Sequence, residues 1–152
     1  MNEKKIIAYD ENIKEIIKSE ILRLGINADL NHIDVRNVTD MTGLFCDSIF
    51  NGNISKWNVS SVNRMVGLFL RAEFNGDISK WDVSGVKKAR AMFVQSKFNR
   101  YIGDWKFHED LELDDSIIHV LENSYNIKNQ KELSELKLII SSDPLNTIKR
   151  AL

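Results

Sequence analysis

The chain has 152 residues, of which 43% are hydrophobic and 28% are charged. This composition is typical of a globular chain of one domain and excludes a disordered one. The 21 basic and 22 acidic residues leave a net charge of −1, which argues against a protein that coats nucleic acid or an anionic membrane. No apolar run is long enough for a signal sequence or a membrane span, so we expect a cytoplasmic protein.

The first 26 residues are expected to form an N-terminal cap. The segment Lys4–Tyr9 is strand-like, and Asp10 is placed to cap a helix that stops at Gly25. The apolar face of this expected helix carries Ile13, Ile16, Ile17, Ile21 and Leu24.

Residues 27–110 are dominated by a repeat with a period of 24. Trp57, Trp81 and Trp105 are spaced by this interval, and so are two sets of phenylalanines: Phe45, Phe69 and Phe93, and Phe50, Phe74 and Phe98. The segment from Phe50 to Ser60 recurs almost letter for letter from Phe74 to Ser84. Such self-similarity indicates stacked repeat units, each of which buries its apolar side against its neighbours.

Within one unit the apolar pattern changes its period. Trp57 and Val59 alternate as in a short strand, whereas Val62, Met65, Val66 and Phe69 follow helical spacing. The Asn-Gly pairs after Phe50 and Phe74 favour turns. We therefore predict an α/β repeat fold: a short leucine-rich-repeat-like solenoid of about four 24-residue turns, with parallel strands and helical caps at both ends.

Residues 111–152 are expected to form the C-terminal cap. Helical patterns run from Ser116 to Asn123 and from Gln130 to Ile140, and Pro144 closes the second of them.

The repeated run Phe-Asn-Gly-Asp-Ile-Ser-Lys-Trp-Asp-Val-Ser at 74–84, with Val86 and Phe93 after it, resembles the BspA-like leucine-rich repeat of bacterial surface proteins. The resemblance extends from Leu30 to Phe107, about half of the chain. It implies a solenoid that is used for adhesion and protein contacts.

The residue types that carry chemistry do not form a catalytic pattern. The tryptophan position is occupied by Ile33 in the first unit, so we expect the indoles to pack in the core. Cys46 is equivalent to Leu70 and Val94, which favours an inert thiol. The chain has no phosphate loop, no nucleophile elbow and no zinc motif. We expect a protein that is not an enzyme and has no metal, cofactor or small-molecule substrate.

If Trp57 and Val59 point inward, the polar residues between the apolar positions point outward in columns 24 residues apart. We interpret this strand face as a candidate surface for another protein, with an ordinary solvated sheet face as the alternative. Its residues are His32, Asp34, Arg36, Lys56, Asn58, Lys80, Asp82, Asp104 and Lys106.

A second set of residues is basic and lies in the third unit. It could contact phosphates, although a solvated helix face explains it as well. The set consists of Lys87, Lys88, Arg90, Lys97 and Arg100.

Three functional hypotheses follow from these observations. The first is a non-enzymatic protein-binding module whose partner is unidentified. The second is a phage- or mobile-element-encoded inhibitor of a bacterial defence enzyme, similar in role to an anti-CRISPR protein. The third is nucleic-acid binding through the basic residues.

Overall fold

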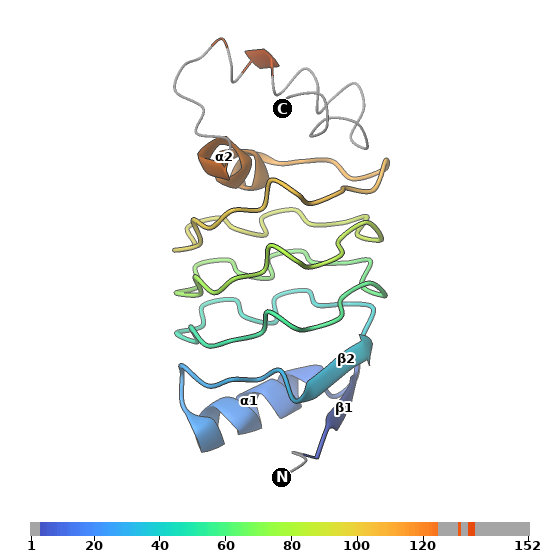
Figure 1. The fold of residues 1–152 in the computed structure, drawn as a ribbon, viewed down its shortest axis with the longest axis vertical. Coiled ribbons are helices and arrows are strands. Elements are labelled where there is room, and N and C mark those ends of the chain that lie inside the picture. The colour runs from blue at the N-terminus through green and yellow to red at the C-terminus, as the bar shows by residue number, and fades with distance from the viewer. Residues whose placement is uncertain (1–3, 125–130, 132–133, 136–152) are drawn as a thin grey trace.

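The computed structural model describes residues 4–124, 131 and 134–135. This part contains two strands and two helices, in the order β1 (Ile6–Tyr9), α1 (Ile13–Leu24), β2 (Ile33–Asn37) and α2 (Asp115–Ser124). β1, α1 and β2 lie at the N-terminal end of the molecule. The residues between β2 and α2 form stacked loops of backbone, and α2 lies beyond them, toward the other end (Figure 1).

The N-terminal end is a strand–helix–strand unit. β1 and β2 pair in parallel, and α1 buries Ile13 and Ile17. Gly25 ends the helix with a φ of 97°, in the region that favours glycine. The expected strand before Asp10 and the expected helix with its stop at Gly25 are confirmed.

Asp10 itself has a different role from the expected one. The N-cap of α1 is Asn12, whereas the carboxylate of Asp10 accepts hydrogen bonds from the backbone N–H groups of Thr39 (2.6 Å) and Asp40 (3.1 Å). Asp10 therefore joins the N-terminal unit to the segment that follows β2.

Between β2 and α2 the chain forms turns and isolated bridges, with no helix and no further strand. The predicted fold class, a leucine-rich-repeat-like solenoid of about four turns with parallel strands, is therefore wrong. The described residues hold two helices and one two-stranded parallel sheet.

The helix expected after Val62 does not form because its backbone N–H groups have other acceptors. The N–H groups of Met65 and Gly67 bond to the carbonyls of Lys88 and Arg90, at 2.7 and 2.9 Å. Leu68 bonds only three residues back, to the carbonyl of Met65, whereas an α-helix needs bonds four residues back. Gly67 also has a positive φ of 59°, which interrupts helical backbone.

The strand expected around Trp57 is replaced by two turns. The N–H of Trp57 bonds to the carbonyl of Ile54, and the N–H of Val62 bonds to that of Val59, at 3.1 and 2.9 Å. Bonds three residues back close β-turns and do not pair strands.

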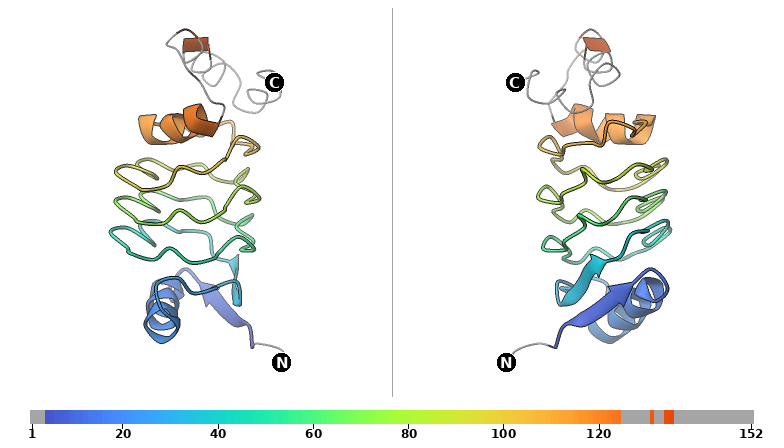
Figure 2. Two further views of the ribbon diagram at one scale, coloured as in Figure 1. Left: turned by 60° about the vertical axis from the view of Figure 1, so that its left-hand side comes forward. Right: turned by 90° about the vertical axis from the view of Figure 1, so that its right-hand side faces the viewer.

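A set of backbone hydrogen bonds, here called the ladder, connects the rows 40–47, 64–71 and 88–94. Between the N-terminal unit and α2 the backbone winds in successive stacked loops, here called levels (Figure 2). In the first pair of rows, the N–H groups of Met41, Gly43, Phe45 and Asp47 bond to the carbonyls of Arg64, Val66, Leu68 and Leu70. In the second, those of Met65, Gly67, Phe69 and Arg71 bond to Lys88, Arg90, Met92 and Val94.

Stacked aromatic rings form the middle of the core. The ring centroids of Phe45 and Phe69 are 5.6 Å apart, and those of Phe69 and Phe93 are 5.8 Å apart. Trp57 and Trp81 stack at 6.4 Å with 5° between their planes. The 24-residue spacing in the sequence therefore places like rings against each other.

The C-terminal end of the described part is α2, which buries Ile117, Val120 and Leu121. The helix expected from Ser116 to Asn123 is confirmed. The expected helix from Gln130 to Ile140 falls almost entirely outside the described residues.

Candidate functional site

Three buried tryptophans, here called the tryptophan anchors, fix the backbone that carries the candidate surface. Trp57, Trp81 and Trp105 are at most 4% exposed, so the expectation that they pack in the core is confirmed. Each Nε1–H donates to the carbonyl of the residue 27 positions earlier, at 2.9, 3.2 and 3.1 Å. Every anchor thus ties its own level of the chain to the level before it.

The residues on either side of each anchor are exposed and polar. Six of the nine predicted surface residues lie in these positions, on turns and not on a strand. We call these six the polar face: Lys56, Asn58, Lys80, Asp82, Asp104 and Lys106.

Two members of the polar face also shape the turns. Oδ1 of Asn58 accepts hydrogen bonds from the N–H and the hydroxyl of Ser60, at 3.1 and 2.6 Å. Asp82 makes the same two bonds with Ser84. These bonds lower the pKa of Asp82 against the opposing effect of burial, and the charge of Lys106 contributes to the lowering. Asp82 is therefore a charged group in a fixed position.

The three lysines of the polar face have no ion pair within 4.0 Å in the described part of the chain. These ammonium groups are therefore available to pair with carboxylates of a partner.

Asp104, on the same face, accepts a hydrogen bond from the hydroxyl of Tyr101 at 3.1 Å. Burial and this carboxylate raise the pKa of Tyr101.

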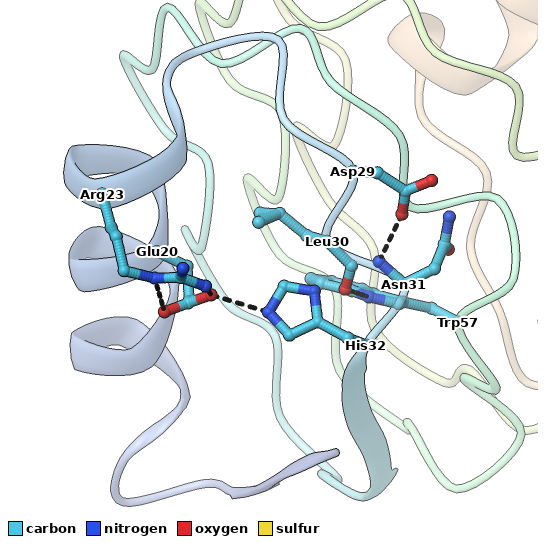
Figure 3. A network of polar contacts seen from close by, with 7 residues as sticks. All are labelled: Glu20, Arg23, Asp29, Leu30, Asn31, His32 and Trp57. Atoms are coloured by element: carbon cyan, nitrogen blue, oxygen red, sulfur yellow. Dashed lines mark hydrogen bonds and ion pairs between the residues drawn. The ribbon is translucent and has the colours of Figure 1, made fainter. Parts of the chain in front are cut away.

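His32 does not belong to the exposed surface, contrary to our expectation. Its side chain is 10% exposed, and its Nε2 lies 2.6 Å from Oε2 of Glu20. Glu20 lies on α1, and Arg23 of the same helix donates to its carboxylate (Figure 3). The sequence pattern placed His32 outward, but α1 covers that position in the first level of the chain.

Asp34 and Arg36 are paired with each other. The guanidinium of Arg36 donates to both carboxylate oxygens of Asp34, with the shortest distance at 2.6 Å. These hydrogen bonds hold the pKa of Asp34 below its usual value. The Asp34 side chain is 8% exposed and that of Arg36 is 64% exposed. Only Arg36 of this pair is accessible to a partner.

The predicted basic residues are not gathered into one patch. Lys87, Lys88 and Arg90 line a groove of about 650 Å³ whose other wall carries acidic residues, Asp110, Glu112 and Asp114. Lys97 lines a separate groove beside α2, and Arg100 donates to the carbonyl of Asn75 at 2.5 Å. The negative charges of the acidic wall would repel a phosphate bound beside Lys87, Lys88 and Arg90.

Cys46 has the environment of an unreactive thiol. It is partly buried, and its sulfur lies 3.3 Å from Oδ2 of Asp47. Burial raises the pKa of the thiol, and the carboxylate of Asp47 raises it further. Among the described residues, no three His, Cys, Asp or Glu side chains are grouped to hold a metal ion.

Sequence reasoning missed the polar contacts that connect the levels. Arg71 donates to the carboxylate of Asp47, 24 residues earlier, at 2.5 and 2.7 Å, and this holds the pKa of Asp47 at about 2. Arg64 pairs with Asp40 across the same interval, at 3.2 Å. The signal that could have found both pairs is opposite charge at a spacing of 24.

Comparison with known proteins identifies the family. A family model described as "Mycoplasma protein of unknown function, DUF285" matches residues 12–131. The chain belongs to the DUF285 family. The DUF285 match covers α1, β2, the whole polar face and α2. No curated protein and no solved structure matches the chain. Within the described residues, no helix has the length and apolar character needed to cross a membrane.

Proposed function

We propose that this DUF285 protein is a non-enzymatic protein-binding module and that its polar face contacts the partner. One observation carries the proposal: exposed charged residues flank three buried tryptophans that are bonded to earlier backbone, and the three lysines among them have no ion pair in the described part of the chain.

The arrangement of charges favours a partner with carboxylates. Lys56 and Lys80 occupy equivalent positions in successive levels, and two neighbouring like charges repel each other. A carboxylate of a partner that approaches both ammonium groups removes this repulsion and forms two charge-assisted hydrogen bonds. Asp82 and Asp104 then define where basic groups of the same partner fit.

We further propose that the protein works in the cytoplasm and that the resemblance to BspA-like repeats reflects a shared use in protein contacts. Nucleic-acid binding is the weaker candidate, because carboxylates face Lys87, Lys88 and Arg90 across their groove.

The test is charge reversal on the polar face. Tagged full-length chain and its K56E/K80E variant are purified from the native cells, and partners are quantified by mass spectrometry. We expect recovery of the partner to fall about tenfold or more, because two attractive contacts become repulsive.

The matched control is K87E/K88E, which makes the same charge change outside the polar face. Partner recovery from this variant should equal that of the unmodified chain. If K56E/K80E retains its partners while remaining folded, the polar face is not the binding surface.

A further inference from the structure

The outer edge of β1 is an unused pairing surface. β1 belongs to a two-stranded sheet, so one of its edges has no strand beside it in the described part of the chain. The strand lies at the outer end of the molecule (Figures 1 and 2). On β1, Ile7 is 51% exposed and Tyr9 is 42% exposed. An exposed apolar edge of this kind is a template for another strand.

The backbone groups at this edge are open around Ile7 and closed at Tyr9. The N–H of Ile6 bonds to the carbonyl of His32 at 3.1 Å, on the β2 side. Since successive residues of a strand alternate in direction, the N–H and C=O of Ile7 point to the outer edge. At Tyr9, the side chain of Asn12 accepts the N–H at 2.8 Å and the N–H of Asn12 donates to the carbonyl at 3.1 Å. A strand that adds here must therefore centre on Ile7.

The sequence around Ile7 complements itself when two copies run antiparallel. Lys5 precedes the centre and Tyr9 follows it at the same distance. Pairing centred on Ile7 therefore places Lys5 opposite the partner's Tyr9. This pair joins an ammonium group to an aromatic ring.

We propose that two copies of this chain associate through the outer edges of β1, antiparallel, with Ile7 on the two-fold axis. The product is a four-stranded sheet with β1 of both copies at its centre. Each copy presents the same edge to the other, as a two-fold interface requires. This dimer does not use the polar face and is independent of the function proposed for it.

The first test measures the mass of the full chain by light scattering during size-exclusion chromatography over a range of concentrations. We expect twice the monomer mass of 17.5 kDa. Ile7→Asp places two carboxylates face to face on the axis and should return the mass to that of the monomer. Ile49→Asp changes an apolar residue that is 63% exposed and lies outside β1, and it should leave the dimer intact.

The second test uses disulfide cross-linking in the Cys46→Ala background. Hydrogen-bonded antiparallel partners have Cα atoms about 5.5 Å apart, within the range that a disulfide spans. Ile7→Cys should therefore form a covalent dimer under oxidising conditions. Lys5→Cys should not, because the two copies of position 5 are four residues apart along the sheet, about 13 Å.

Three results would overturn the proposal. They are a monomeric unmodified chain at every concentration, a dimer that survives Ile7→Asp, and equal cross-linking through positions 5 and 7. Circular dichroism of each variant confirms that the chain is folded.

Discussion

At the scale of single residues, the contact between Glu20 and Arg23 gives a buried carboxylate its charged partner. Glu20 is 7% exposed and is the buried charged residue of the described core. Hydrogen bonds from the Arg23 guanidinium hold the pKa of its carboxyl at about 2; burial opposes this lowering, and His32 adds to it. The folded state therefore favours the charged form far more than the unfolded chain does.

This lowered pKa predicts a loss of stability in acid. A carboxyl with a lowered pKa stabilises the fold above its ordinary value of 4.5, and this contribution disappears as the pH falls from 4.5 to about 2. We expect the contribution of Glu20 at neutral pH to be about 2–3 kcal/mol. Urea unfolding of the unmodified chain and of Glu20→Gln should show that difference at pH 7 and a much smaller one at pH 2.5.

Glu15→Gln is the control for this prediction, because Glu15 is an exposed carboxylate of the same helix. It should change the free energy of unfolding little at either pH. A difference between the unmodified chain and Glu20→Gln that stays constant with pH would contradict the prediction.

At the scale of elements, Asp114 holds together the start of α2 and the end of the ladder. One carboxylate oxygen accepts the N–H groups of Ser116 and Ile117, at 3.1 and 3.2 Å, as an N-cap does. The other accepts the N–H of Ala91, in the last row of the ladder. In the ladder each N–H bonds to a carbonyl 23 residues later, so a further row would have offered Ala91 the backbone carbonyl of residue 114. A side chain therefore ends the ladder in place of a further row.

Two variants of Asp114 separate these roles. Asp114→Ala removes the cap and leaves the N–H of Ala91 without its acceptor, so we expect a loss of about 2–4 kcal/mol. Asp114→Asn keeps the cap, because asparagine is an equally good N-cap, but it turns one oxygen into a donor; we expect about half of that loss. Chemical denaturation gives both values.

Hydrogen exchange identifies the cause. The amide of Ala91 should exchange faster in both variants, whereas the first amides of α2 should do so only in Asp114→Ala. Unchanged exchange at Ala91 would show that Asp114 does not end the ladder.

At the scale of the whole molecule, stability depends on one continuous core. Buried residues from Ala8 to Leu121 form a single cluster. Phe69 lies at its middle, with the rings of five other residues within 6.4 Å: Phe45, Phe74, Trp81, Phe93 and Phe98. The levels of the chain therefore support each other through these rings.

Phe69→Ala should lower the free energy of unfolding by about 3–5 kcal/mol, because removing the phenyl ring leaves a cavity among the five neighbouring rings. Unfolding should still show a single transition, because these rings belong to one continuous core. Leu22→Ala, at a residue 78% exposed, should change it by about 0.5 kcal/mol or less. Thermal and urea unfolding followed by circular dichroism measure both. Two separate transitions in the Phe69 variant would mean that the levels unfold independently.

Local patterns in the sequence predicted β1, α1 and α2, and also the burial of the three tryptophans. These signals depend on residues close together in the chain or on apolar bulk alone. The prediction of a helix after Val62 was wrong, because helical spacing of apolar residues does not show where the backbone N–H groups find acceptors. At Met65 and Gly67 the acceptors are 23 residues away.

The repeat pattern predicted only part of the candidate surface correctly. Lys56, Lys80 and Lys106 are exposed because the repeat fixes their direction beside a buried anchor. His32 is covered because α1, which belongs to no repeat, packs over that position. A periodic pattern carries no information about a neighbour that occurs once.

The tryptophan anchors also provide intrinsic fluorescent probes of unfolding. Trp57, Trp81 and Trp105 are buried, and the Nε1–H of each is bonded to the carbonyl of the residue 27 positions earlier. Fluorescence of each indole therefore reports on unfolding in its own part of the core. Variants that keep one tryptophan each should share one unfolding midpoint if the core unfolds as a single unit.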